Sequence, residues 1–293
     1  MSPMQVGLGK RLCSPLGALI LFNSAILTSA TAAEKWEALP AHPDITIAYV
    51  PPSKAQWQPL MGALQQRKVL EELRSFLAPL RLPHPLALRT RQCDVVNAFY
   101  NPADRSITLC YELVAWAVEQ APAAVSPDGF ITREAAIFGN VIGILLHEAG
   151  HMLFNMLDVP RFGREEDAAD QIAVFLALQF NKEIGRTIVK GFVYFWAIGR
   201  DPSSHSPMSA WADEHGSASQ RMYNGLCLAY GGDPKTFAEF VDRGWLPKDR
   251  AADCADEYNQ VKRAFVKTVL PFIDPTLMVR VQNAEWLTRE EMK

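Results

Sequence analysis

The segment Ala135–Leu157 constrains the fold more than any other feature of the sequence. Its length and apolar composition predict a long helix, with Thr132 as the N-cap and Glu134 in the first turn. His147 and His151 lie four residues apart within it. Residues at this spacing project from the same face of a helix, one turn apart. The apolar residues that precede His147 predict that this helix is buried, so the core must form around a helix that carries polar groups.

The two histidines belong to the sequence His-Glu-Ala-Gly-His, which has the pattern H-E-x-x-H. In this pattern two imidazoles can bind one metal ion, while the glutamate reaches a metal-bound water instead of the metal. The sequence therefore predicts His147 and His151 as metal ligands and Glu148 as a catalytic base. The alternative is a pair of helical histidines on a packed face that binds no metal.

A second helix supplies a candidate third ligand. A catalytic zinc site needs three protein ligands and an open fourth position. Glu166 and Asp170 are four residues apart in the predicted helix Arg164–Phe180, so Glu166 can bind the metal and Asp170 can accept the free ring N–H of a ligand histidine. Glu165 and Asp167 are rival ligands, but neither has an acidic residue four positions later. The alternative is a charged first turn of a solvated helix, where acidic residues are favoured.

His215 is a further candidate for catalysis. It lies in Trp211-Ala212-Asp213-Glu214-His215, just before the predicted helix Ser217–Tyr230. A protonated histidine at this position can stabilise the oxyanion that forms during amide hydrolysis. The alternative is an exposed histidine in a turn.

The remaining segments predict an α+β fold with a sheet-bearing part, residues 34–131, and a helical part, residues 132–293, in a single domain of residues 34–293. Cys93–Glu112 has the pattern of a β-hairpin, with its turn at Asn101-Pro102-Ala103-Asp104. The other predicted strands are Ile45–Val50 and Leu86–Arg91, and the other predicted helices are Leu60–Leu80, Ile188–Ile198 and Ala251–Val269.

Residues 1–33 have the pattern of a secretory signal peptide. Lys10 and Arg11 precede the apolar run Leu12–Leu27, and Ala30-Thr31-Ala32 offers the small residues that a signal peptidase needs. We expect an exported protein, periplasmic or extracellular, with no stable membrane insertion after cleavage. An uncleaved membrane anchor is the alternative, but the apolar run is interrupted and falls short of the roughly 20 residues that span a bilayer.

Four cysteines remain after the signal peptide is removed, and they allow three disulfide pairings. Cys93 and Cys110 lie near the open end of the predicted hairpin, and Cys227 and Cys254 lie on two late helices. Export makes disulfides chemically plausible, so we expect Cys93–Cys110 and Cys227–Cys254. The formal net charge is −3 and no block of lysine and arginine occurs, so nucleic-acid binding is not expected.

These motifs resemble the gluzincins, thermolysin-like zinc peptidases in which H-E-x-x-H is followed by E-x-x-x-D. The chain more closely resembles a family of secreted bacterial metallopeptidases that also carries Asn97-Ala98-Phe99-Tyr100, Leu109-Cys110-Tyr111-Glu112 and Asp213-Glu214-His215…Gln220-Arg221. The resemblance covers most of the mature chain. The gap between His151 and Glu166 is shorter than in thermolysin, so the pocket residues and calcium sites of thermolysin are not carried over.

The resemblance implies a zincin-like fold, one zinc ion on His147, His151 and Glu166, a peptide or protein substrate, and a hairpin sheet beside the cleft. Two other functions stay open. The chain can be a zinc-containing binding protein without turnover, or an amidase that acts on cell-wall peptide. The sequence predicts neither the physiological substrate nor the oligomeric state.

Overall fold

The structure is a computed structural model that describes residues 44–198 and 212–276. All of these residues belong to one compact unit, Thr31–Lys293. The expected signal peptide lies outside the described residues.

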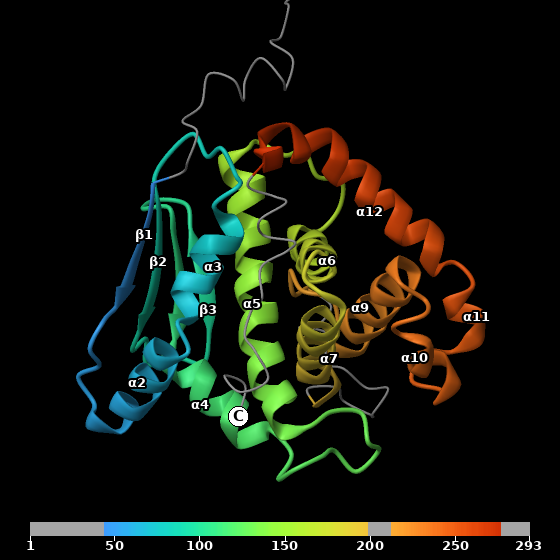
Figure 1. The fold of residues 1–293 in the computed structure, drawn as a ribbon, viewed down its shortest axis with the longest axis horizontal. Helices are drawn as coiled ribbons and strands as arrows, with labels where there is room; N and C mark the ends of the chain where they lie inside the picture. Colours follow the sequence, from blue (N-terminus) through green and yellow to red (C-terminus); the bar gives the residue numbers. More distant parts are fainter. Residues whose placement is uncertain (1–43, 199–211, 277–293) are drawn as a thin grey trace, which may run out of the picture. The chain divides into compact units, whose positions relative to one another are not determined.

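The N-terminal part of the fold is a four-stranded mixed sheet with the strand order β1-β2-β4-β3 (Figure 1). β1 and β4 both run parallel to β2, whereas β3 pairs with β4 in the antiparallel direction. β4 lies between two strands and all of its residues are buried. β3 is therefore an edge strand, and it forms the predicted hairpin with β4. The strand bounds are Ile45–Tyr49 for β1, Leu86–Arg91 for β2, Ala98–Asn101 for β3 and Ser106–Cys110 for β4.

The helix expected over Leu60–Leu80 is divided into two helices, α2 (Gln58–Gln66) and α3 (Val69–Leu77). Lys68 between them has a φ of 51°, which is left-handed backbone that an α-helix cannot contain. The apolar spacing runs across this break because Leu64 of α2 is buried like the apolar residues of α3, so the pattern alone predicts one helix. A single turn of 3₁₀ helix, η1 (Ala55–Trp57), precedes α2.

The hairpin expected to run to Glu112 instead ends at Cys110, and helix α4 (Tyr111–Gln120) begins at the next residue. The Tyr111 side chain is fully buried, and its hydroxyl donates a hydrogen bond to the carbonyl of Val50 at 2.7 Å. The apolar residues at the start of α4 are compatible with a strand or a helix, so the local pattern does not separate the two.

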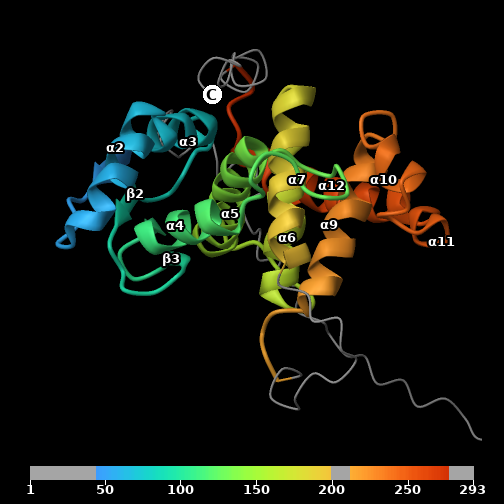
Figure 2. The same cartoon turned by 90° about the horizontal axis from the view of Figure 1, so that it is seen from below.

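Helix α5 (Arg133–Met156) is the central element of the fold. The Thr132 hydroxyl caps it by accepting a hydrogen bond from the Ala135 N–H at 3.2 Å, as expected. α5 lies between the sheet and two further helices, α6 (Glu165–Ala177) and α7 (Lys182–Ile198) (Figure 2). Among the described residues α5 is long and apolar enough to cross a membrane, but 89% of its most apolar window is buried inside the protein. It is therefore a core helix.

Small residues allow α7 to approach α5 closely. A Cβ atom at Gly139 would lie 2.2 Å from the Thr187 carbonyl oxygen, and one at Gly143 would lie 2.6 Å from the Phe192 Cβ. These distances are far below van der Waals contact. The α5 backbone therefore lies directly against the α7 backbone at Gly139 and against the Phe192 side chain at Gly143. This contact places the aromatic residues of α7 beside the polar face of α5.

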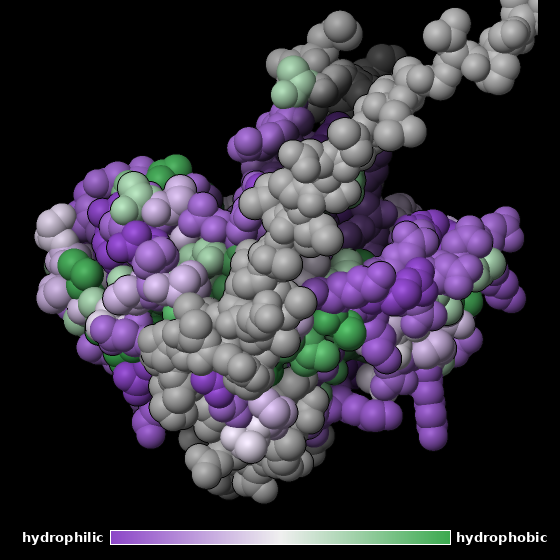
Figure 3. Space-filling view, turned by 90° about the horizontal axis from the view of Figure 1, so that it is seen from above, coloured by the Kyte–Doolittle hydropathy of each residue, from purple (hydrophilic) through white to green (hydrophobic). Residues whose placement is uncertain are grey.

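The C-terminal part consists of helices. α9 (Ala218–Gly232) packs against α6 and α7, and α12 (Cys254–Thr268) packs against α6 and α9. The side chains of Ser217 and Gln220 form a capping box at the start of α9. Among the described residues visible in Figure 3, most are hydrophilic, and the hydrophobic ones form separate patches. The described residues thus form a mixed α+β fold of one small sheet and many helices. The elements here are α9 (Ala218–Gly232), α10 (Ala238–Asp242), α11 (Lys248–Ala251), α12 (Cys254–Thr268) and the 3₁₀ helix η2 (Leu270–Phe272).

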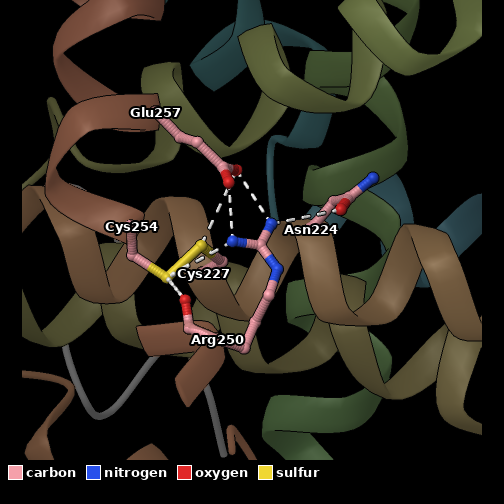
Figure 4. The surroundings of a disulfide bond; sticks show 5 residues. All are labelled: Asn224, Cys227, Arg250, Cys254 and Glu257. Atoms are coloured by element: carbon pink, nitrogen blue, oxygen red, sulfur yellow. Dashed lines mark hydrogen bonds and ion pairs between the residues drawn. A yellow bond between two sulfur atoms is a disulfide. The ribbon is translucent and has the colours of Figure 1, made fainter. Parts of the chain in front are cut away.

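The structure contains both expected disulfides. Cys93 and Cys110 join the start of the hairpin segment to the end of β4, with their Cα atoms 5.5 Å apart. Cys227 and Cys254 join α9 to α12, with their Cα atoms 5.0 Å apart. Beside the second disulfide, the Arg250 guanidinium donates hydrogen bonds to the Glu257 carboxylate at 2.6 and 2.8 Å (Figure 4).

Candidate metal centre

The side chains of His147, His151 and Glu166 converge on one point between α5 and α6. The Nε2 atoms of the two histidines are 3.1 Å apart. The Glu166 carboxylate lies 3.1 Å from the Nε2 of His147 and 3.4 Å from the Nε2 of His151. One donor atom from each residue lies within 4.8 Å of the other two. The structure therefore brings together the three groups that the sequence predicts as metal ligands.

The spacing of these donors fits a metal ion. Zinc binds histidine nitrogen and carboxylate oxygen at about 2.0–2.2 Å, and a tetrahedral arrangement then places its ligands roughly 3.3–3.5 Å from each other. The three separations of 3.1 to 3.4 Å are close to this value. Two histidines and one glutamate are also a donor set that catalytic zinc sites use. The residues present fit a single zinc ion with one coordination position left open.

His147 is held in orientation from its opposite ring nitrogen. Its Nδ1 lies 2.8 Å from an oxygen of Asp170, which is the contact predicted for this residue. The Arg221 guanidinium donates two hydrogen bonds to the same carboxylate, at 2.5 and 2.7 Å. Arg221 is buried and stacks over the Trp196 ring, with its Cζ 3.5 Å from the ring centroid. These contacts leave the Nε2 of His147 directed at the centre.

His151 is also held by a carboxylate at the ring nitrogen that faces away from the centre. Its Nδ1 lies 2.9 Å from an oxygen of Glu165, and the other oxygen of Glu165 accepts a bond from Arg161 at 2.9 Å. Glu165, a rival for the ligand role in the sequence, therefore contacts the far side of the imidazole. Asp167, the other rival, is not among the converging donors.

Glu148 lies in the floor of the site without joining the donor triad. It is 6% exposed, and one of its oxygens accepts a hydrogen bond from the Tyr100 backbone N–H at 2.7 Å. This bond comes from β3, so the outer edge of the hairpin lies directly beside the centre. The sequence pattern gives no sign of it, because Tyr100 and Glu148 are 48 residues apart.

Burial and the neighbouring charges shift the pKa values of these groups in opposite directions. Burial raises the pKa of the Glu148 carboxyl above its usual value. Burial alone would lower the pKa of His147, but the hydrogen bonds to Asp170 and Glu166 outweigh it and raise this pKa to about 9. Burial opposes ionisation of Asp170, and the bonds from Arg221 and His147 outweigh it and hold its pKa below the usual value.

His215 lies beside the centre and is not isolated on the surface. Its Nε2 is 3.0 Å from an oxygen of Glu166, and its Nδ1 is 2.9 Å from an oxygen of Asp213. About 40% of its side chain is exposed. Asp213 thus orients the ring, while the opposite nitrogen points at a residue of the triad.

The donor triad, Glu148 and His215 line a cleft with a volume of about 750 Å³. The outer edge of β3 forms part of its wall, and aromatic side chains of α7 form another part. The donor triad and Glu148 lie in the same cleft. The lining also includes Leu113 and Ile144, Asn155, Arg161 and Arg164, and Phe192, Phe195 and Trp196.

The sequence patterns predict no role for Arg221, Trp196 or the backbone of Tyr100. The one available signal for Arg221 was its place in the segment Gln220-Arg221, which the resemblance singled out without a role. A second group of possible metal donors among the described residues, Cys93, Cys110 and Glu112, is not a metal site because its two sulfurs form a disulfide. The Glu112 carboxylate there accepts hydrogen bonds from the backbone N–H groups of Cys93 and Asp94.

The fold and the site define an α+β protein with a candidate metal centre of two histidines and one glutamate in a cleft. Residues 49–269 match a family described as "Putative metallopeptidase", and the chain belongs to this family. The family supports peptide hydrolysis and implies a metal. No curated protein and no solved structure matches the chain.

Proposed function

We propose that this protein is an exported, gluzincin-type peptidase that hydrolyses peptide bonds with one zinc ion. The observation that carries the proposal is the convergence of His147, His151 and Glu166 at separations that suit one tetrahedral ion. The order H-E-x-x-H then E-x-x-x-D and the edge strand beside the motif helix support a zincin-like fold.

Bound zinc would supply a Lewis acid that polarises the scissile carbonyl and acidifies a water molecule. Glu148 is the proposed general base. Its buried carboxylate takes a proton from the attacking water and later gives it to the leaving nitrogen, so one amide bond and one water become a carboxylic acid and an amine. A raised pKa strengthens Glu148 as a proton acceptor, which is the direction that burial produces.

The edge of β3 is the proposed binding surface for an extended substrate. Alternate residues of an edge strand direct their backbone groups to opposite sides. The Asn97 carbonyl accepts a bond from the Cys110 N–H on the β4 side, whereas the Tyr100 N–H is directed to the opposite side, where Glu148 accepts its hydrogen bond. By the same alternation, the backbone groups of Ala98 and the Tyr100 carbonyl are also directed to that side. A peptide can therefore add to this edge as a further strand, held by main-chain hydrogen bonds.

His215 is the proposed stabiliser of the oxyanion. Its ring is oriented by Asp213 and reaches the triad, which supports a role at the reacting carbonyl. Export is supported by the two disulfides, which persist in oxidising compartments. Cleavage of residues 1–33 is proposed with it, and the mass of the purified mature chain tests this point.

The proposed function is tested by comparing the wild-type chain with Glu148→Gln. The substitution keeps the shape of the side chain and removes the base. Zinc content and thermal stability should stay nearly unchanged, whereas cleavage of a broad peptide library should fall by about 10²–10⁴-fold.

The outcomes separate the proposed function from its rivals. A wild-type protein that holds zinc and binds peptides without cleaving them would be a binding protein. Cleavage of cell-wall peptide with no cleavage of the library would show an amidase. A variant that cleaves as fast as wild type would mean that Glu148 is not the base.

A further inference from the structure

Arg164 brings a positive charge without an ion pair to the wall of the cleft. It is the N-cap residue of α6, its side chain is exposed, and it lines the cleft two residues before Glu166. Within residues 44–198 and 212–276, its guanidinium makes no hydrogen bond or ion pair. Nearby Arg161 differs, because it bonds to Glu165 and lies over the Phe154 ring at 5.2 Å. The charge of Arg164 is therefore available to a ligand.

The two ends of the cleft lie at different positions along the axis of α5 and are lined by different kinds of side chain. Phe192 packs against Gly143, before the motif, whereas Arg161 packs against Phe154, after it. A helix rises 1.5 Å per residue, so these contacts are about 16 Å apart along the axis, with the metal centre between them. One end of the cleft is aromatic and the other is cationic.

The direction of β3 decides which end of the cleft holds the N-terminal side of a bound peptide. β3 starts next to Cys110, which directly precedes α4. Trp116 of α4 packs against Phe195 of the aromatic end, with their ring centroids 4.8 Å apart. Farther along β3, the Tyr100 hydroxyl donates to Asn155 in the last turn of α5, at the cationic end. A peptide that pairs antiparallel with β3 therefore runs from the cationic end to the aromatic end. Antiparallel pairing is the more stable arrangement per residue.

The carboxylates near the cationic end do not compensate Arg164. Both oxygens of Glu165 are engaged, one by His151 and one by Arg161. Glu166 belongs to the donor triad. A carboxylate on the substrate can therefore pair with Arg164, because a guanidinium binds carboxylates in a paired geometry.

We propose that Arg164 is a specificity-determining residue that binds an acidic side chain on the N-terminal side of the scissile bond. The substrate class is then a peptide with aspartate or glutamate before the cleaved bond. This inference rests on the proposed peptidase activity. Because the guanidinium is exposed, the preference for an acidic over a neutral residue should be about two- to fivefold in kcat/KM and should weaken as salt is added.

The test uses internally quenched decapeptides with phenylalanine after the scissile bond. Glutamate or glutamine occupies, in turn, each of the three positions before that bond. We would measure kcat/KM for the zinc-loaded wild type, Arg164→Gln, Arg164→Glu and the control Arg74→Gln, which alters an exposed arginine of α3 outside the cleft. Wild type and the control should prefer glutamate at one or more of these positions. Arg164→Gln should lose the preference, and Arg164→Glu should reverse it.

The result separates this inference from the proposed function. If the wild type cleaves neither peptide set while zinc is bound, the peptidase activity itself fails. Equal cleavage of the glutamate and glutamine peptides by wild type, or a preference that survives in Arg164→Gln, would overturn the role of Arg164 alone. A second peptide set carries glutamate or glutamine at the second or third position after the scissile bond. An Arg164-dependent preference found only in this second set would overturn the proposed direction of binding.

Discussion

Single carboxylates decide the orientation of both candidate ligand histidines. Asp170 holds the Nδ1 of His147, and Glu165 holds the Nδ1 of His151. Each carboxylate is held in turn by an arginine. A histidine whose Nδ1–H is donated in this way presents a free Nε2 lone pair to a metal. The two histidines are therefore preorganised, which lowers the entropic cost of binding an ion.

The first prediction concerns Glu166 as the third metal ligand. Glu166→Ala removes a donor from the triad, so zinc should be lost on dialysis, whereas wild type should retain one zinc per chain. Asp167→Ala is the matched control, because Asp167 is the next acidic residue and lies outside the triad. Metal analysis of the three proteins checks this. Full zinc occupancy in Glu166→Ala would exclude Glu166 as the third ligand.

The second prediction concerns His215. A group that acts mainly in the transition state affects kcat more than KM, so His215→Ala should lower kcat with little change in KM. The 3.0 Å contact with Glu166 offers a different role, in which His215 only positions the ligand. That role predicts weaker zinc binding instead. Steady-state kinetics at saturating zinc, with a zinc titration against a chelator, separates the two, and unchanged values in both would leave His215 without a role.

Among the secondary-structure elements, the contact between α5 and α7 positions one wall of the cleft. Glycines at this contact let Phe192 and its aromatic neighbours approach the motif helix. The same helix receives β3 on its other side through the Tyr100–Glu148 hydrogen bond. α5 thus carries the motif and also spaces the two walls of the site.

The third prediction tests this contact with a pair of substitutions. Gly143→Ala places a Cβ 2.6 Å from Phe192, so it should destabilise the fold by about 1–3 kcal/mol through overpacking. Gly62→Ala in α2 meets nothing within 4 Å and should stabilise the fold by about 0.5–1 kcal/mol, since alanine favours a helix. Denaturant unfolding of both variants measures the difference. Equal stabilisation by the two changes would show that α7 does not approach α5 this closely.

At the scale of the whole molecule, the two disulfides hold different parts of the fold. Cys93–Cys110 holds the hairpin that contributes β3 to the cleft, and Cys227–Cys254 joins α9 to α12. Each closes a short loop, with sequence separations of 17 and 27 residues. Cross-links of this kind stabilise mainly by restricting the unfolded chain.

The fourth prediction is that loss of either disulfide destabilises the fold by roughly 2–4 kcal/mol. Paired serine substitutions at each bridge, followed by thermal unfolding, measure the loss. Loss of the Cys93–Cys110 bridge should also raise KM, because the edge strand it holds is the proposed surface for substrate. Non-reducing peptide mapping of wild type checks the pairing, and crossed pairs or free thiols would contradict it.

The local regularities of the sequence were enough to predict the helices and strands that matter most. The bounds of β1, β2, the hairpin, α5 and α6 follow closely from apolar spacing, turn residues and a threonine cap. The same spacing predicts that His147 and His151 share one helix face, and that Glu166 and Asp170 share another. Such features depend on a few neighbouring residues, so a short window of sequence contains them.

Contacts between residues that are distant in the sequence depend on the tertiary structure alone. The bonds from Arg221 to Asp170 and from Tyr100 to Glu148 join residues 51 and 48 positions apart, and no periodic pattern relates them. The break at Lys68 and the start of α4 at Tyr111 were also missed, since apolar spacing continues across them. The sequence determined which chemical groups the chain offers and on which helix faces. Packing of α5 against β3, α6 and α7 decided which of them meet, because the free energy of that packing depends on the whole core.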